Sequence, residues 1–419
     1  MSITADPAFD VESIRRDFPI LAQRLSNDRT LVYLDTAATS QKPRVVIDKM
    51  VECFEHFNSN VHRGIHELGD RMTTELENAR ENVRQFIGAA DVDEIVFTSG
   101  TTMSLNIVAH GWARKFLKPG DEVLVNAMEH HANLVPWQLA ARATGAELRY
   151  IPLTDDGRLD LSRLDEVLTS RTRLLAVTAM SNVLGTVNPI AELARRAHDV
   201  GALICVDAAQ SVPHGHTDVQ GAKIDFLAFS GHKLYGPTGI GVLYARRELQ
   251  EAMDPFLAGG HMIREVFEQS STWADPPAKF EAGTCPFVEA VAMSTAIDYL
   301  RAVGLDRIAQ YEHQLSSYAH QRMRGIPGIR LLGPSVDHKG AILSFVIEGL
   351  HAHDLSDLLD RQGVAIRAGH HCTMPLHDLY GLTSSARASL AFYNTRGEVD
   401  KLVEAILGAQ KVFQRPKRK

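Results

Sequence analysis

Short apolar runs alternate with stretches of helical periodicity from about Tyr33 to Gly304. The runs are bounded by turn residues, which is typical of buried strands. They predict strands at Glu94–Thr98, Glu122–Asn126, Leu174–Thr178, Leu203–Val206 and Phe226–Phe229. Between them, Ala132–Thr144 and Glu192–Val200 predict helices, each followed by a glycine where helices commonly end. This alternation predicts a large α/β lobe with a mostly parallel sheet.

The pattern changes after Gly304. A long helical stretch runs through Tyr311–Met323 and stops at Pro327-Gly328. It is followed by predicted strands near Ile342–Ile347, Val364–Arg367 and Arg387–Tyr393, and by predicted helices at His353–Arg361 and Gly397–Phe413. These elements predict a smaller α+β lobe at the carboxyl end.

The amino-terminal segment begins with a predicted helix near Val11–Phe18, which the pattern alone allows against either lobe. We expect three parts: an N-terminal segment, residues 1–30, that packs with the small domain, a large domain of residues 31–304, and a small domain of residues 305–419.

Composition and charge limit the function classes. The chain has 419 residues, of which 45% are hydrophobic and 23% charged, so it can bury a large core. Its 44 Lys+Arg and 51 Asp+Glu give a net charge of −7, which speaks against nucleic-acid binding through a basic surface. Only Arg415–Lys419 form a basic run. The chain shows no secretory signal and no run of about 18 apolar residues, so we expect a cytoplasmic protein without a membrane span.

The four cysteines, Cys53, Cys205, Cys285 and Cys372, lie far apart in the sequence. Without a CxxC pair, they indicate neither a disulfide framework nor a four-thiolate zinc site. We expect each to be a buried apolar side chain unless its context argues otherwise.

Polar residues follow the predicted strands, and in open parallel sheets ligands bind at the carboxyl ends of the strands. Ser99-Gly100-Thr101-Thr102 joins a strand to a helix start, which suits either a phosphate site or an ordinary helix cap. The adjacent pair His130-His131 is a poor metal site and indicates one functional histidine beside a structural one. Ser181-Asn182 follows the next strand.

Asp207 and Lys233 also stand at strand ends. Asp207 suits a ligand-binding carboxylate or a structural cap. Lys233 lies between glycine turns in Ser230-Gly231-His232-Lys233, where a desolvated amine would have a lowered pKa and suit Schiff-base chemistry. The alternative is a lysine that only covers the sheet end. Together with the threonine-bearing helix start, these residues match what pyridoxal phosphate requires: an amine, a carboxylate for the ring nitrogen and a phosphate site.

The small lobe adds Arg367-Ala368-Gly369-His370-His371-Cys372 and Arg387. Neighbouring His-His-Cys side chains rarely converge on one metal ion, so we expect no metal site there. A cysteine on a glycine turn beside imidazoles is instead expected to be exposed and reactive as a thiolate. Arg387 offers the planar fork that binds a carboxylate, although many arginines form only surface ion pairs.

These motifs resemble the pyridoxal-phosphate-dependent cysteine desulfurases of the sulfur-mobilisation (Suf) type, in the class V aminotransferase group. That family has the fold type I architecture of pyridoxal-phosphate transferases, with a seven-stranded, mostly parallel sheet. The resemblance runs from Ile14–Pro19 and Tyr33–Ala38 to Tyr393–Thr395. Its most specific segments are Val61–His66, Glu129–Asn133, Ser230–Lys233 and Arg367–Cys372.

The resemblance implies a role for each site residue in converting L-cysteine to L-alanine. Lys233 binds the cofactor covalently and moves the α-proton, Asp207 pairs with the pyridine nitrogen, and Gln210 contacts the ring oxygen. His130 stacks on the ring and handles protons at the substrate thiol. The implied phosphate ligands are Thr101, Thr102, Ser230, His232 and, from the partner subunit of a homodimer, Thr284. The substrate carboxylate is bound by Asn182 and Arg387, and Cys372 takes the sulfur as a persulfide.

The resemblance also implies a sulfur-acceptor protein for iron–sulfur cluster assembly, because the short segment around Cys372 cannot carry a persulfide far. His353 matches a histidine of relatives that serve a zinc-bearing, scaffold-like acceptor, where it replaces a thiolate on the metal. The alternative is a helix-start histidine beside Asp354.

Two departures from the family pattern are Met103, where Glu is frequent, and Cys285, where Pro is usual. The second puts the reach of Thr284 in doubt. Two other functions stay open at this point: a selenocysteine lyase, which can dispense with the nucleophilic cysteine, and a non-catalytic scaffold.

Overall fold

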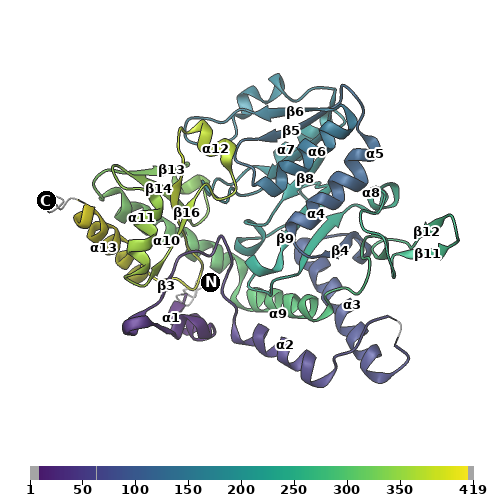
Figure 1. Cartoon of the computed structure of the whole chain (residues 1–419), viewed down its shortest axis with the longest axis horizontal. Helices are drawn as coiled ribbons and strands as arrows, with labels where there is room; N and C mark the ends of the chain where they lie inside the picture. The colour runs from purple at the N-terminus through teal and green to yellow at the C-terminus, as the bar shows by residue number, and fades with distance from the viewer. Residues whose placement is uncertain (1–8, 63, 414–419) are drawn as a thin grey trace, which may run out of the picture.

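A seven-stranded sheet forms the centre of the large lobe in the computed structural model, which describes residues 9–62 and 64–413 (Figure 1). Its spatial order is β4-β10-β9-β8-β7-β5-β6. The strands are β4 (Ile95–Thr98), β5 (Glu122–Asn126), β6 (Glu147–Ile151), β7 (Thr172–Thr178), β8 (Leu203–Asp207), β9 (Phe226–Ser230) and β10 (Gly241–Ala245). Only β10 runs antiparallel to its neighbours, which confirms the mostly parallel sheet. The sequence pattern had not indicated β6 or β10.

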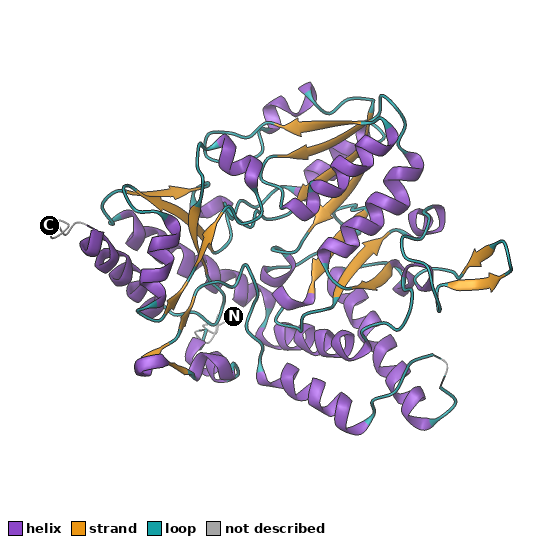
Figure 2. Ribbon diagram, in the orientation of Figure 1, coloured by secondary structure: helices purple, strands orange, loops and turns teal. Residues whose placement is uncertain are grey.

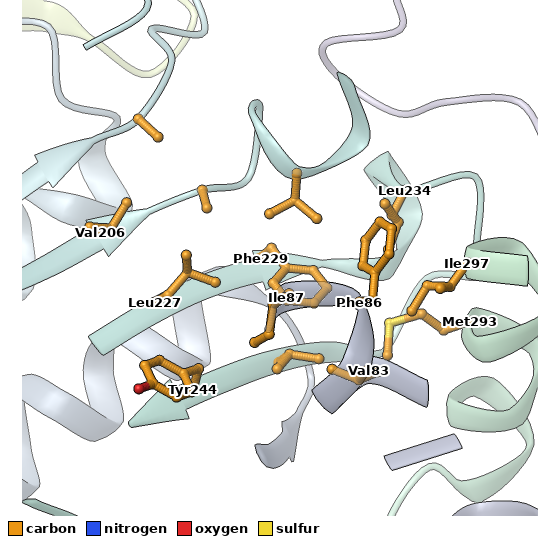
Figure 3. Close-up of a cluster of buried hydrophobic side chains, with 14 of the residues drawn as sticks. Val83, Phe86, Ile87, Val206, Leu227, Phe229, Leu234, Tyr244, Met293 and Ile297 are labelled. Carbon is orange, nitrogen blue, oxygen red and sulfur yellow. The ribbon is translucent and has the colours of Figure 1, made fainter. Parts of the chain in front are cut away.

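Helices cover both faces of this sheet because alternate strand residues point to opposite sides. Val96 and Leu243 belong to one core, with α4 and α6, whereas Leu227 and Phe229 pack against α3 and α9 in the other (Figure 3). The helices of this lobe are α2 (Arg44–His56), α3 (Glu67–Ile87), α4 (Thr101–Val108), α5 (Arg114–Phe116), α6 (Val135–Thr144), α7 (Ile190–Asp199), α8 (Arg247–Ala252) and α9 (Phe287–Val303).

The carboxyl-terminal lobe contains a four-stranded antiparallel sheet in the order β13-β14-β17-β16, packed against helices (Figure 2). Its elements are α10 (Leu305–Arg324), β13 (Ile329–Leu332), β14 (Ile342–Ile347), α11 (Ala352–Asp360), β15 (Val364–Ala365), β16 (Arg367–Gly369), α12 (Met374–Leu379), β17 (Ser385–Ser389) and α13 (Arg396–Phe413). It has a separate hydrophobic core, which also includes Val32 and Leu34, whereas Leu305 and Ile308 at the start of α10 belong to the core of the large lobe.

Two predicted strands of this lobe are shorter than the pattern suggested. The segment Val364–Arg367 divides, because β15 pairs in parallel with β3 (Val32–Tyr33) whereas β16 pairs with β17. The strand predicted to reach Tyr393 ends at Ser389. Beyond it, the Asn394 side chain accepts the Ala391 N–H at 2.8 Å and closes a turn.

The amino-terminal helix α1 (Val11–Arg16) ends before Pro19, and the segment that contains it contacts both lobes. Arg15 forms an ion pair at 3.0 Å with Glu398 on α13, close to the small lobe in Figure 1. Phe18 packs instead against Tyr235 of the large lobe and Phe392. The N-terminal segment therefore fastens the two lobes to each other.

The remaining strands form two short hairpins, β1 (Arg24–Leu25) with β2 (Arg29–Thr30), and β11 (Ile263–Val266) with β12 (Ser271–Trp273). Arg63 and the basic run Arg415–Lys419 lie outside the described residues. None of the helices in the described part of the chain has the length and apolar composition required to cross a bilayer.

Candidate active site

A cavity of about 280 Å³ lies at the carboxyl ends of the sheet strands, where the small lobe faces them. Most of the residues singled out in the sequence line it: Thr101, Thr102, His130, Asn182, Asp207, Gln210, Ser230, His232, Lys233, Cys372 and Arg387. The topology thus brings together residues from loops that are far apart in the sequence.

The turn between β4 and α4 is held by hydrogen bonds to Ser230, the last residue of β9. The Thr101 N–H donates to the Ser230 Oγ at 2.8 Å, and the two hydroxyl groups lie 2.7 Å apart. Gly100 has a φ of 142°, and a Cβ on Gly241 would lie 2.4 Å from its Cα. The close backbone approach requires glycine at position 241, and the positive φ favours glycine at position 100. It places the N-terminus of α4, which favours anions, at the cavity.

Asp207 is the last residue of β8, and Lys233 ends the 3-10 turn Gly231–Lys233 that follows β9. Burial lowers the pKa of Lys233 to about 8, and the nearby Asp207 opposes this shift. Among the described residues, the Lys233 amine has no hydrogen-bond partner. Asp207 accepts the Ala209 N–H at 3.0 Å, and burial raises the pKa of its carboxyl. The lysine therefore faces the cavity, while the aspartate both caps the turn and lines the cavity.

The backbone before Lys233 is held by a cluster of donors that the sequence did not indicate. The His232 carbonyl accepts from the Ser40 N–H (3.1 Å), the Thr39 hydroxyl (3.0 Å) and the Lys42 amine (2.9 Å). Burial lowers the pKa of Lys42 to about 8 and that of the His232 ring to about 4. The donors Thr39, Ser40 and Lys42 directly follow the motif Tyr33–Ala38, which is the nearest signal in the sequence.

His130 lies in the cavity wall, and its Nδ1 accepts the Ala132 N–H at 3.1 Å. Burial and the positive charge of Lys233 lower the pKa of His130 to about 4. Behind it, Glu129 is fully buried and accepts from the Asn133 amide at 2.6 Å. Since the Nδ1 of His130 is an acceptor, the neutral ring carries its hydrogen on Nε2.

Arg387 lies on β17 and is nearly fully buried. It donates to the Asn182 carbonyl at 2.8 Å and to Asp35 at 3.2 Å, while its Nε is buried without a partner. Arg367, which also lines the cavity, binds the same Asp35 at 3.0 Å. Arg367 lies in one of the motifs singled out in the sequence, but no role was predicted for it or for Asp35.

Cys372 is exposed, whereas Cys53 and Cys205 are buried as predicted and Cys285 is partly buried. It lies on the loop between β16 and α12, and its backbone has a positive φ of 58°. Within the described ranges, no three His, Cys, Asp or Glu side chains form a group that could hold a metal ion.

Thr284 and His353 lie outside the main cavity. Thr284 lines a second cavity of about 180 Å³ with residues that include Asn60, His62 and Cys285. His353 is exposed at the start of α11, where its N–H donates to the His351 ring at 3.3 Å. Neither position therefore belongs to the site that a single chain forms.

Comparisons with known proteins agree with this architecture. The family model "Aminotransferase class-V" matches residues 32–402. A probable cysteine desulfurase of Streptomyces coelicolor is 48% identical over 96% of this chain and 98% of its own length. The cysteine desulfurase of Dickeya dadantii is 48% identical over 95% of this chain and 96% of its own.

Solved structures give the same result. The crystal structure of the cysteine desulfurase CsdA from Escherichia coli superposes with a TM-score of 0.89 at 40% identity, covering 96% of this chain and 99% of that one. The apo cysteine desulfurase of Thermococcus onnurineus has a TM-score of 0.90 at 36% identity, covering 98% of this chain and all of that one. The chain belongs to the class-V aminotransferase family and, within it, to the cysteine desulfurases.

Proposed function

We propose that this protein converts L-cysteine to L-alanine and transfers the sulfur to Cys372 as a persulfide. The observation that carries the proposal is the joint placement of a desolvated lysine and an exposed cysteine. Lys233 from the large lobe and Cys372 from the small lobe line one cavity. One group suits proton transfer and covalent cofactor binding, and the other suits attack on sulfur.

Pyridoxal phosphate fits this donor set. The Lys233 amine is without a hydrogen-bond partner in the described structure, and the buried Asp207 has a protein donor on only one of its oxygens. The N-terminus of α4, with Thr101 and Thr102, is suited to the phosphate. Gln210, Ser230 and His232 complete the proposed binding set. When bound, the cofactor supplies an electron sink for charge that develops at the substrate carbon.

Four side chains of the chain would act on the substrate. Arg387 and Asn182 line the cavity side by side and would bind the substrate carboxylate, and the buried Nε of Arg387 has no partner within the protein. Because neutral His130 carries its hydrogen on Nε2, it can donate a hydrogen bond from Nε2 to the sulfur of the substrate. Lys233, whose pKa is lowered to about 8, moves the proton at the α-carbon.

The sulfur transfer balances without an added oxidant or reductant. The bond between the substrate Cβ and its sulfur breaks, and a sulfur–sulfur bond forms with the Cys372 Sγ. The hydrogen that the Cys372 thiol loses is returned to the carbon product, which leaves as alanine. Cys372 is thereby left with a terminal –SH on its sulfur.

Two variants test the proposal. Cys372→Ser should retain the cofactor absorbance but release no alanine or sulfide from L-cysteine, whereas Lys233→Ala should lose the covalent cofactor absorbance. Normal turnover of cysteine by Cys372→Ser would refute the role of Cys372. Comparing cysteine with selenocysteine in Cys372→Ala tests the alternative of a selenocysteine lyase, which predicts retained turnover of selenocysteine.

The finer assignments also belong to this proposal. They are an acceptor protein for iron–sulfur cluster assembly of the Suf type, a homodimer in which Thr284 reaches the partner's phosphate site, and a cytoplasmic location. Exposure of Cys372 and His353 supports docking of an acceptor on this face. A pull-down with a zinc-loaded acceptor should lose efficiency in His353→Ala, and sedimentation should give a dimer mass.

A further inference from the structure

His131 joins the large lobe to the loop that carries Cys372. It lies in the short 3-10 turn His131–Asn133, which follows β5. Its backbone N–H donates to the Cys372 carbonyl at 2.8 Å. Its ring Nε2 accepts the Met374 N–H at 3.1 Å. One residue thus forms hydrogen bonds on both sides of the exposed thiol, across the boundary between the lobes.

The loop needs such contacts because its backbone is unfavourable by itself. His371 and Cys372 are consecutive non-glycine residues in the left-handed region, with φ of 51° and 58°. Residues in this region persist only where the surroundings hold them, and they are concentrated at functional sites. A second contact from the large lobe is the Asn182 amide, which donates to the His371 carbonyl at 2.8 Å.

The ring of His131 can accept this hydrogen bond only in its neutral form, with the hydrogen on Nδ1. Burial and the neighbouring His370, whose ring centroid lies 5.7 Å away, both lower the pKa of His131 and so favour the neutral ring. Nε2 is therefore an acceptor at the position where the backbone of Met374 presents a donor.

We propose that His131 is a positioning residue that holds the Cys372 loop against the large lobe, so that the thiol stays directed at the cavity while it takes up sulfur. The loop contact itself stands on the hydrogen bonds above, and its consequence for sulfur uptake rests on the proposed function. The two adjacent histidines thus have different roles. His130 lines the cavity, and His131 holds the loop that carries the nucleophile.

The test compares His131→Leu, which removes the acceptor at similar volume, with His131→Gln, which keeps an acceptor at similar reach. Hydrogen exchange of the Met374 amide is measured by mass spectrometry on the cofactor-loaded protein. In the Leu variant it should be faster by about tenfold, as expected for the loss of one hydrogen bond. The Gln variant should stay close to the parent. If the Leu variant does not fold, His131→Phe replaces it, because Phe keeps a planar ring without an acceptor.

A second readout is the rate at which the Cys372 persulfide forms in a single turnover with L-cysteine. It should fall in the Leu variant and recover in the Gln variant, while cofactor absorbance and Tm stay at the parent values. Unchanged exchange in the Leu variant would overturn the proposed contact, and faster exchange with an unchanged persulfide rate would overturn its role in sulfur uptake. Exchange does not depend on turnover, so a failure of the desulfurase proposal is seen separately, in Cys372→Ser.

Discussion

The two halves of the candidate active site are built on different principles. Asp207 is the last residue of β8 and Lys233 ends the short turn after β9, so their positions are fixed by the sheet. Cys372 is an exposed residue on a loop with a left-handed backbone, which is held by hydrogen bonds within the small lobe and by others that cross between the lobes. Asp207 is buried and Lys233 partly buried at the sheet, whereas the Cys372 side chain is exposed on its loop.

The difference agrees with the role proposed for each half. A lysine with a lowered pKa requires burial, because only desolvation makes the neutral amine favourable. A cysteine that passes sulfur to a second protein has to be reached from solvent. Variants that affect the sheet side should therefore alter chemistry or stability, and variants near the cysteine should alter sulfur delivery.

The largest effect is expected from Asp207→Asn. Loss of the carboxylate removes the proposed partner of the cofactor ring nitrogen, so kcat with L-cysteine should fall by about 10²-fold or more. The Tm of the cofactor-free protein should be no lower than that of the parent, because burial disfavours the charged carboxyl. A variant with cofactor bound and parental kcat would contradict the assignment of Asp207.

Gly241→Ala should destabilise the sheet side of the site, because there is no space for the added methyl group. The added Cβ would lie 2.4 Å from the Gly100 Cα and 2.7 Å from the Phe229 carbonyl, so the backbone has to shift. Such overpacking costs about 1–3 kcal/mol, which thermal unfolding would detect as a lower Tm. Affinity for the cofactor phosphate should fall as well, because the turn at Thr101 moves. The matched control is Gly215→Ala, which meets no atom within 4 Å at a φ that any residue adopts.

A smaller effect, on the stability of the fold, is expected when the pH is lowered. Burial lowers the pKa of His130, His232 and His320 to about 4, whereas an unfolded histidine keeps a pKa near its ordinary value of 6.5. Between these values the unfolded state binds more protons. The stabilisation is therefore complete above pH 6.5 and is lost as the pH falls toward 4.

The measurement is Tm against pH from 7 to 4.5. His320→Gln, in a helix of the small lobe, should make the slope shallower by about one proton. The site itself is unaltered in that variant, so kcat at pH 7 should stay parental. An unchanged slope would show that His320 is not buried in its neutral form.

Local signals explain which parts of the site the sequence could predict. Asp207 follows an apolar run directly and Lys233 follows one after three residues, so each strand and its polar end are visible in one short window. Asp35 could not be found this way, because its partners Arg367 and Arg387 lie more than 300 residues away. The antiparallel β10 was missed for a related reason: its place between β4 and β9 depends on tertiary pairing.

The smallest effect on the fold is expected at two exposed apolar side chains close to Cys372. Met374 and Leu379, at the two ends of α12, are 52% and 58% exposed, so Met374→Ala and Leu379→Ala should change stability by no more than about 0.5 kcal/mol. If an acceptor docks on this face, sulfur transfer to it should slow, while alanine formation with a small thiol as acceptor stays parental. Leu139→Ala, 43% exposed on α6, is the control and should affect neither reaction. Equal transfer rates in all three variants would place the acceptor elsewhere, because removing apolar contact area from a docking surface weakens binding.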